Sequence, residues 1–502
     1  MSVMIFGQTL KWVRTPFAHQ ELRKLESLGL YDGADKDTLE GYLLSHDDVL
    51  AKVGILRATS FESDYRRRSQ NFHVELDPSP KVLAYARPDR IGKAYLSRGL
   101  IIALEDACQS VTSDIRSLYA LNSDDAAMQA LNMAPNVAWL PQLSNVLDPY
   151  RYVNYEPMIE IAKVNNDRAI VGLFHKFVSH SQFRQDLGDF LSLLSVIWVS
   201  SHEDAHFFLG HINYFNDRLG SLPGEPGSYF SEFVGKYTNA QNQELRLSAE
   251  LAADSNAAVV LTDHLCFDEM YSINSFLNKH IQHLAPMLIN SGISKEALKT
   301  IYLFRLAVVA ATIAIAVFER NTIKNSSASP EYPTMGIRIL NIVQEISGRI
   351  MVISQVHPER ELARLTMENW IHAFLMAQRD IEIILLYLFE QGFVLYDGAI
   401  KVRTVDEILE FKLDKQMLGE FVSFLIFYAF EPRAIAGLNL ERRRELTEYF
   451  SKHILAIKNS EKFSEFRLAV PGQKKEKVEE SLAFDRKQAE NLAGMIEAIQ
   501  SI

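Results

Sequence analysis

Apolar residues recur along most of the chain at intervals of three and four, which is the spacing of one face of a helix. The runs that keep this spacing are long, and short polar stretches separate them. They predict a helix from about Leu100 and further helices at residues 186–217, 241–265, 295–320, 338–356, 359–390 and 417–430. The pattern therefore favours a mainly α protein.

Residues 72–97 instead alternate apolar and polar side chains, as a half-buried strand does. The segment FHVELD shows this alternation, and Pro78 and Pro80 end it. Residues 81–97 then have the pattern of two strands joined by a turn at Pro88 and Asp89. We expect a small antiparallel sheet here, so that the fold class is mainly α with an α+β core.

Changes in composition divide the chain into three parts. Residues 1–71 mix charged and apolar side chains without a clear pattern, and residues 321–333 (NTIKNSSASPEYP) have the Ser, Asn and Pro content of a linker. We expect an N-terminal region of unassigned role at residues 1–71, a core at 72–325 and a helical C-terminal region at 326–502.

The charge and the cysteines limit the classes of function. A net charge of −11 argues against general nucleic-acid binding, because that needs a basic face to displace the counterions of phosphates. The two cysteines, Cys108 and Cys266, have no CxxC partner, so neither a disulfide framework nor a thiolate zinc site is expected. The start of the chain carries Lys11 and Arg14 after its apolar run, the reverse of a secretory signal. These features favour a cytoplasmic protein.

The most apolar stretch is LAVVAATIAIAVF, residues 306–318. It is shorter than the roughly 20 residues that a membrane span requires, and Arg305 precedes it. We expect a helix buried in the protein and no transmembrane span, while peripheral contact with a membrane stays open.

The segment SSHEDAHFFLGH, residues 200–211, places titratable side chains in an apolar helical run. His202 and His206 are four residues apart, so their imidazoles project from one helix face. Two neutral imidazoles suit zinc, and Glu203 lies beside the first of them in the pattern HExxH. A metal lowers the pKa of a water molecule to roughly 7, and a neighbouring carboxylate can then take its proton as the water attacks a carbonyl.

The third ligand must come from elsewhere. His211 would point about 180° away from His202 if the helix continued, so it is interpreted as a packing or hydrogen-bonding residue. Glu250 and Asp254 share a face of the Ala-rich segment RLSAELAADSNAAVVL, where an unpaired charge would be costly. Glu250 as third ligand and Asp254 as acceptor for a ligating imidazole N–H would give both acids partners.

Simpler interpretations stay open for both groups. His202 and Glu203 would be solvated if Ser200 or Ser201 capped the start of a surface helix. Glu250 and Asp254 would be a solvated acidic stripe, with Glu250 paired to Arg246.

The order of these motifs resembles that of HExxH…ExxxD zinc metallopeptidases, the gluzincins. Within them, HEDAHFFLGHINYF is most similar to the peptidase family typified by the bacterial phage-exclusion protease Lit. The likeness covers about residues 72–338. It implies a zincin-like core in which His202, His206 and Glu250 bind Zn²⁺, Glu203 is the general base and Asp254 supports the ligands. It also implies that a strand within residues 81–97 accepts a substrate backbone as an added strand.

A peptidase also needs a donor to the developing oxyanion. Tyr214, His264, Tyr332 and Arg338 are candidates. Arg338 and Tyr332 are favoured, because the segment SPEYPTMGIRI is a polar loop that opens an apolar helix.

The expected function is that of a zinc metalloendopeptidase acting on a protein or peptide substrate, with a link to phage defence implied by the resemblance. The alternative is a helical interaction or regulatory protein whose metal site is structural or inactive. A regulatory partner or a homo-oligomer is compatible with either.

Overall fold

The protein is described from a computed structural model. The structure describes residues 2–5, 8–11, 72–77, 83–87, 92–113, 150–154, 175–179, 182–219, 240–267, 294–323, 335–366, 440–470 and 473–501, and parts of 369–384. Tyr332, the helix expected at 417–430 and most of residues 1–71 lie outside these ranges. The three-part division of the chain therefore stays a prediction.

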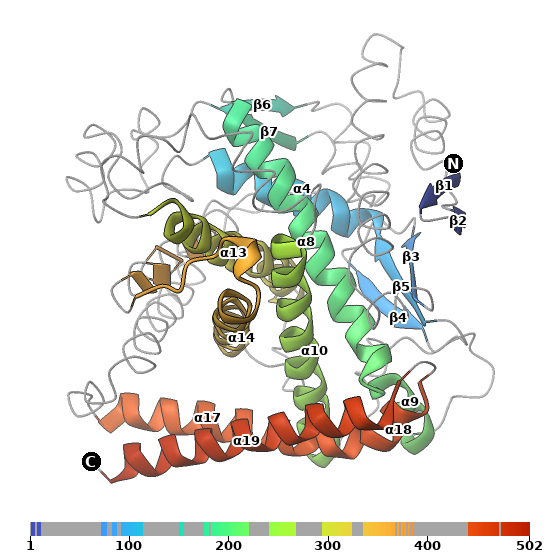
Figure 1. Ribbon diagram of the computed structural model, residues 1–502. Helices are drawn as coiled ribbons and strands as arrows, with labels where there is room; N and C mark the ends of the chain where they lie inside the picture. Colours follow the sequence, from blue (N-terminus) through green and yellow to red (C-terminus); the bar gives the residue numbers. More distant parts are fainter. Residues whose placement is uncertain are drawn as a thin grey trace.

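Helices make up most of the described residues, which confirms the mainly α class. Those that build the core are α4 (Arg98–Ser113), α8 (Gln182–Phe208), α10 (Ala240–Phe267), α13 (Lys295–Ile323) and α14 (Met335–Val356). Figure 1 shows α8 running through the middle of the molecule, where α4 crosses it, and α10 and α13 also pack against α8. The periodicity of apolar residues thus located α10, α13 and α14 to within a few residues at both ends, and the start of α4 to within two residues.

Two predicted helices differ from the structure. The run at 186–217 is interrupted at Leu209 and Gly210, after which α9 (His211–Leu219) begins. The run from 359 starts instead with the 3-10 helix η3 (Pro358–Arg360) and an irregular segment at 361–366. Glu361 ends η3 in the left-handed conformation with a φ of 52°, which stops a helix from continuing there.

The predicted strands are present, but their sheet is mixed. Strands β4 (Ala84–Arg87) and β5 (Gly92–Ser97) pair antiparallel, which confirms the expected hairpin. Strand β3 (Phe72–Asp77) pairs with the other edge of β5 and is parallel to it. The antiparallel sheet that was expected is thus confirmed for β4 and β5, whereas β3 differs: it has the same direction as β5, because β4 runs opposite to both.

The end of this sheet leads directly into α4. The Ser97 hydroxyl accepts a hydrogen bond from the Leu100 backbone N–H at 3.1 Å, which caps the first turn of the helix. The same hydroxyl accepts the N–H of Leu83 at 3.0 Å, beside the start of β4. One side chain therefore fixes both the helix start and the sheet edge. The described strands also include two antiparallel pairs, β1 (Ser2–Ile5) with β2 (Gln8–Lys11) and β6 (Tyr150–Asn154) with β7 (His175–Ser179).

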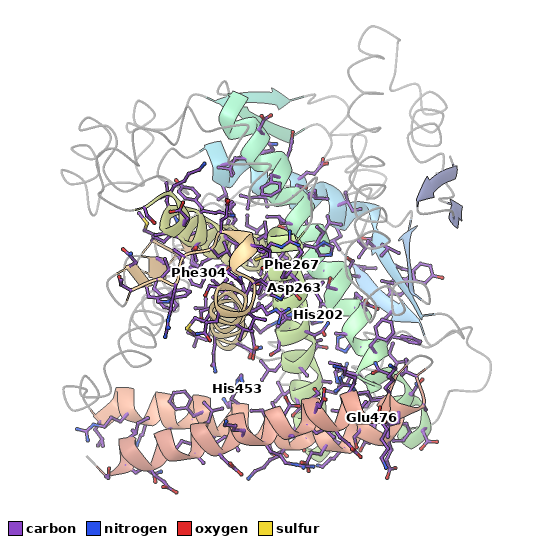
Figure 2. The ribbon with its side chains drawn as sticks, viewed as in Figure 1. His202, Asp263, Phe267, Phe304, His453 and Glu476 are labelled. Carbon is purple, nitrogen blue, oxygen red and sulfur yellow. The ribbon has the colours of Figure 1, made fainter. Side chains whose placement is uncertain are left out.

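The apolar stretch expected to be a buried helix lies in α13. Residues 295–318 of this helix are long and apolar enough to cross a membrane, but 94% of the most apolar window is buried inside the protein. Phe304, labelled in Figure 2, packs against Trp370 and Phe374. Arg305 makes two hydrogen bonds with Asp380, at 2.8 and 3.0 Å. The helix thus has the surroundings of a core helix.

The last described part of the chain is a helical hairpin. It consists of α17 (Leu440–Ser460), the short turns η6 (Glu461–Phe463) and α18 (Ser464–Leu468), and α19 (Lys475–Gln500). Helices α17 and α19 lie side by side in opposite directions, and α17 packs against α10 (Figure 1). We call residues 440–501 the C-terminal hairpin.

Candidate metal centre

Two packed helices carry the predicted metal ligands. His202, Glu203 and His206 lie in the last two turns of α8, and Glu250 and Asp254 lie in the middle of α10. All five side chains are buried, with between 0% and 8% of their surface exposed. The solvated alternatives do not fit this burial, and α8 begins twenty residues before His202 rather than at Ser200 or Ser201.

The three proposed ligands meet at one point. His202 Nε2 lies 3.1 Å from His206 Nε2 and 3.3 Å from Glu250 Oε2, and His206 Nε2 lies 3.7 Å from Glu250 Oε1. A tetrahedral ion with metal–nitrogen bonds of about 2.0–2.1 Å holds its ligand atoms about 3.3–3.4 Å apart. The three donor groups, His202 Nε2, His206 Nε2 and the Glu250 carboxylate, form a triangle of the size that such an ion requires. We call it the donor triangle. His202, His206 and Glu250 form the one group of three donors, among the described residues, that could hold a metal ion.

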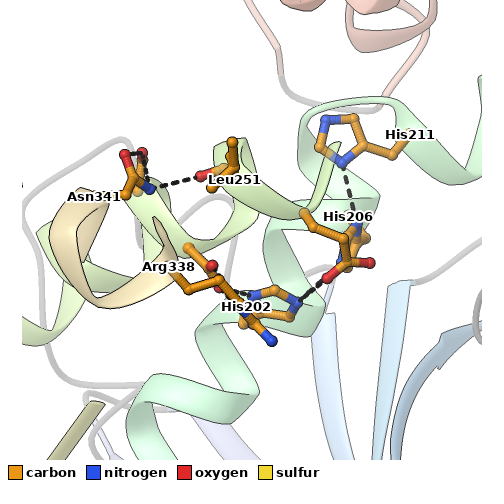
Figure 3. A network of polar contacts seen from close by, with 9 residues as sticks. His202, His206, His211, Leu251, Arg338 and Asn341 are labelled. Atoms are coloured by element: carbon orange, nitrogen blue, oxygen red, sulfur yellow. Dashed lines mark hydrogen bonds and ion pairs between the residues drawn. The ribbon is translucent and has the colours of Figure 1, made fainter. Parts of the chain in front are cut away.

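Asp254 and Arg338 support His202 on the side of its ring that faces away from the other donors. Figure 3 shows Arg338 beside His202. Asp254 Oδ1 lies 2.9 Å from Nδ1 of His202, so the ring nitrogen that faces away from the triangle meets a carboxylate. Arg338, from the first turn of α14, donates from Nε and one terminal nitrogen to the two oxygens of Asp254, both at 2.8 Å. Its guanidinium also lies over the ring of Trp198, 5.9 Å from the centroid, and that ring is 5.4 Å from His202.

His211 supports His206 in the same way. The Nδ1 atoms of the two rings are 3.1 Å apart, so one ring donates a hydrogen bond to the other. The prediction of a hydrogen-bonding role is confirmed, although the reason given for it was wrong. Helix α8 does not continue: Gly210 has a φ of +79°, and the chain turns so that His211 comes back toward His206.

The charges in the site favour ionised carboxylates. Burial opposes ionisation of Glu250, but His206 and His202 outweigh it and lower the pKa of Glu250 to about 2. Burial likewise opposes ionisation of Asp254, and Arg338 and His202 lower its pKa. Burial disfavours protonated His202, yet its contacts with Asp254 and Glu250 raise its pKa to about 10. The acids of α10 thus create a strong attraction for positive charge at the triangle.

Burial is the main cause of the pKa shifts of the other titratable groups. It lowers the pKa of His206 well below the usual range and that of His211 to about 3, so both rings are neutral at pH 7. A neutral imidazole is the form that binds a metal, so His206 has the required form, whereas His202 has to release its proton when an ion binds. Burial raises the pKa of Glu203 to about 7, because the effect of His202 only partly offsets it. A carboxylate with a pKa near 7 is well matched to proton transfer at neutral pH.

The candidates for an oxyanion donor have different positions. Arg338 uses two of its guanidinium nitrogens on Asp254, and its role as a donor stays a prediction. Tyr214 packs against Phe463 and Phe466. His264 lies on the same helix as Glu250 but about 21 Å further along its axis, at 1.5 Å per residue, which places it outside the site.

Sequence reasoning missed residues that position the site without touching the triangle. Asn341, one turn after Arg338, donates to the Leu251 carbonyl at 3.1 Å and to the Ser255 hydroxyl at 3.0 Å (Figure 3). It holds α14 in register with α10. An amide within the apolar run RILNIV was the signal that could have pointed to it. Trp198, one turn before His202, was also missed, because an aromatic residue in an apolar helix has no distinctive pattern.

Comparisons with protein-family models, with curated proteins and with solved structures gave no match. The described geometry therefore supports a candidate metal centre on its own.

Proposed function

We propose that the protein is a zinc-dependent peptidase that hydrolyses a peptide bond with Glu203 as general base. The observation that carries the proposal is the donor triangle of His202, His206 and Glu250. The buried carboxyl of Glu203 follows His202 directly on α8. Zinc sites with a purely structural role are closed by four protein ligands, whereas catalytic sites have three and one open position. Three protein donors favour catalysis over a structural ion.

Each residue has a distinct task in this proposal. A bound zinc ion would polarise the substrate carbonyl and make water more acidic. Glu203 accepts the proton of the attacking water and passes it to the leaving amine, for which a pKa of about 7 suits both directions. Asp254 keeps the His202 ring oriented through Nδ1, and His211 does the same for His206.

The sheet offers a place for the substrate backbone. Strand β4 has β5 on one side and lies at an edge of the three described strands. Helix α8 packs against β4 and β5, so this edge runs near the helix that carries the HExxH residues. An extended peptide that pairs with β4 would be held by main-chain hydrogen bonds. This supports a polypeptide substrate.

The test compares the wild-type protein with Glu203→Gln. We expect equal zinc content in the two proteins and a loss of hydrolysis of about 10²–10⁴-fold, the usual contribution of a general base. Substrates are found by comparing new protein termini in cells that express either form. Asp204→Asn is the matched control, because it removes the neighbouring buried carboxylate of the same helix.

Two outcomes would contradict the proposal. Hydrolysis by Glu203→Gln at the wild-type rate would remove Glu203 from the mechanism. Stoichiometric zinc without any hydrolysis by the wild-type protein would favour a structural or inactive metal site in a helical interaction protein.

A further inference from the structure

The turn that follows the HExxH helix is enclosed by the C-terminal hairpin. A Cβ atom at position 210 would lie 2.5 Å from the backbone nitrogen of Arg467 and 2.8 Å from the carbonyl carbon of Phe466. No side chain fits in that space, so the backbone of the hairpin lies directly against the turn. The turn is also the point at which the chain brings His211 back to His206.

The hairpin contacts this turn through side chains as well. The ring of Phe463 lies 4.7 Å from that of His211 and 5.0 Å from that of Tyr214 on the next turn of α9. Gln473 donates to the backbone carbonyl of Phe208, the last residue of α8, at 3.3 Å. The end of α8, the turn and the start of α9 are therefore each contacted by residues of the hairpin.

The same hairpin also contacts the helix that carries Glu250. Asn459, at the end of α17, donates to the hydroxyl of Ser248 at 3.0 Å, and both side chains are buried. Ser248 in turn donates to the Glu244 carbonyl at 2.7 Å within α10. The bond lies two residues from Glu250. A single element thus contacts both helices that supply the donor triangle.

We infer that the C-terminal hairpin is a positioning element of the metal centre, acting through Phe463 on His211 and through His211 on His206. The inference rests on the proposed metal site and adds a residue that no motif marks. Because a hydrogen-bonded neighbour fixes the orientation of a ligating ring, loss of Phe463 allows His211 to turn away and the ring of His206 to lose its direction. The ring of Phe463 contacts His211 and Tyr214 rather than the three donors, so it is a positioning residue.

The test measures zinc affinity of the full-length chain by competition with a chromophoric chelator. Phe463→Ala is compared with Phe450→Ala, which removes an equally buried ring from the same hairpin, since each phenylalanine is 2% exposed. Phe450 packs in the large apolar core, away from His211. We expect Phe463→Ala to weaken zinc binding by about tenfold or more, the size of effect known for residues that orient a ligand. Phe450→Ala should lower thermal stability but leave the zinc affinity of the folded protein unchanged.

Hydrogen exchange supplies a readout that needs no metal. Backbone amides of residues 203–212 should exchange faster in Phe463→Ala and at the wild-type rate in Phe450→Ala. Phe463→Leu serves as the milder variant if Phe463→Ala does not fold, with the same direction of change expected. Equal zinc affinity and equal exchange in the two alanine variants would overturn the inference. Absence of zinc binding by the wild-type protein would contradict the proposed function, and the exchange comparison would still decide whether the hairpin positions the turn.

Discussion

Two arginine–aspartate pairs join α10 to α14, and they differ in what else they touch. Arg338 binds Asp254 at 2.8 Å through two hydrogen bonds, and Arg349 binds Asp263 in the same paired manner at 2.6 and 2.8 Å. The Arg338 side chain is 8% exposed, whereas that of Arg349 is 32% exposed. Only the first of these two aspartates contacts a proposed metal ligand, His202.

Their surroundings shift the pKa values of the two aspartates in opposite directions. The pKa of Asp254 is lowered, because Arg338 and His202 together outweigh the effect of burial. The pKa of Asp263 is raised, because burial outweighs its bonds to Arg349. Asp263 lies nine residues after Asp254 on α10, roughly 13 Å further along the helix axis. The same pair of residue types thus joins two helices in one place and, in the other, also orients a proposed metal ligand.

The largest expected difference between the two pairs is in stability. Arg338→Met leaves Asp254 buried without its guanidinium, which should lower the free energy of unfolding by about 3–5 kcal/mol. Arg349→Met should cost less, because burial already raises the pKa of Asp263 and this carboxyl can bind a proton once its partly exposed partner is removed. Denaturant unfolding of the two variants measures the difference. Equal losses would show that burial does not separate the pairs.

Zinc should stabilise the protein whenever the site is intact. With free zinc at about 100 times its Kd, the free energy of unfolding should rise by about 2.7 kcal/mol, since the ion binds the folded state alone. This zinc-dependent gain in the free energy of unfolding should persist in Arg349→Met and disappear in His206→Ala. Thermal unfolding with zinc and with a chelator measures it, and a gain of the same size in His206→Ala would place the ion elsewhere.

The smallest difference concerns metal affinity. Asp254→Asn removes the charge that orients His202 and should weaken zinc binding by about 10–100-fold, or about 1.4–2.7 kcal/mol. Asp263→Asn should leave zinc binding unchanged, because its side chain contacts Arg349 rather than a ligand. Chelator competition compares the two. A similar loss in both variants would mean that the link between α10 and α14, and not the contact with His202, controls the site.

The residues of the triangle could be predicted because their signals are local. HExxH places two rings on one helix face, and acids among alanines require partners that an apolar helix does not supply by itself. Glu250 and Asp254 were identified in this way, and the structure places both beside His202.

Asp254 and His211 could be predicted as supports, but the contacts of the C-terminal hairpin could not, because they come from distant parts of the chain. The contact between Asn459 and Ser248 spans 211 residues, and the close approach of Arg467 explains why position 210 is glycine. The charged tail has the pattern of solvated helix faces, which is correct for its outer side and says nothing of Phe463 on its inner side. Periodicity also cannot show that β3 pairs with β5 in parallel, since strand order depends on how the chain returns between them.

The contact of Arg338 with Asp254 determines how far a shortened version of this protein has to extend along the chain. A fragment cut from the start of α8 to the end of α10 would contain every donor atom of the triangle. It would lack the guanidinium that compensates Asp254, so a fragment that keeps the candidate metal site intact has to extend at least into the first turn of α14.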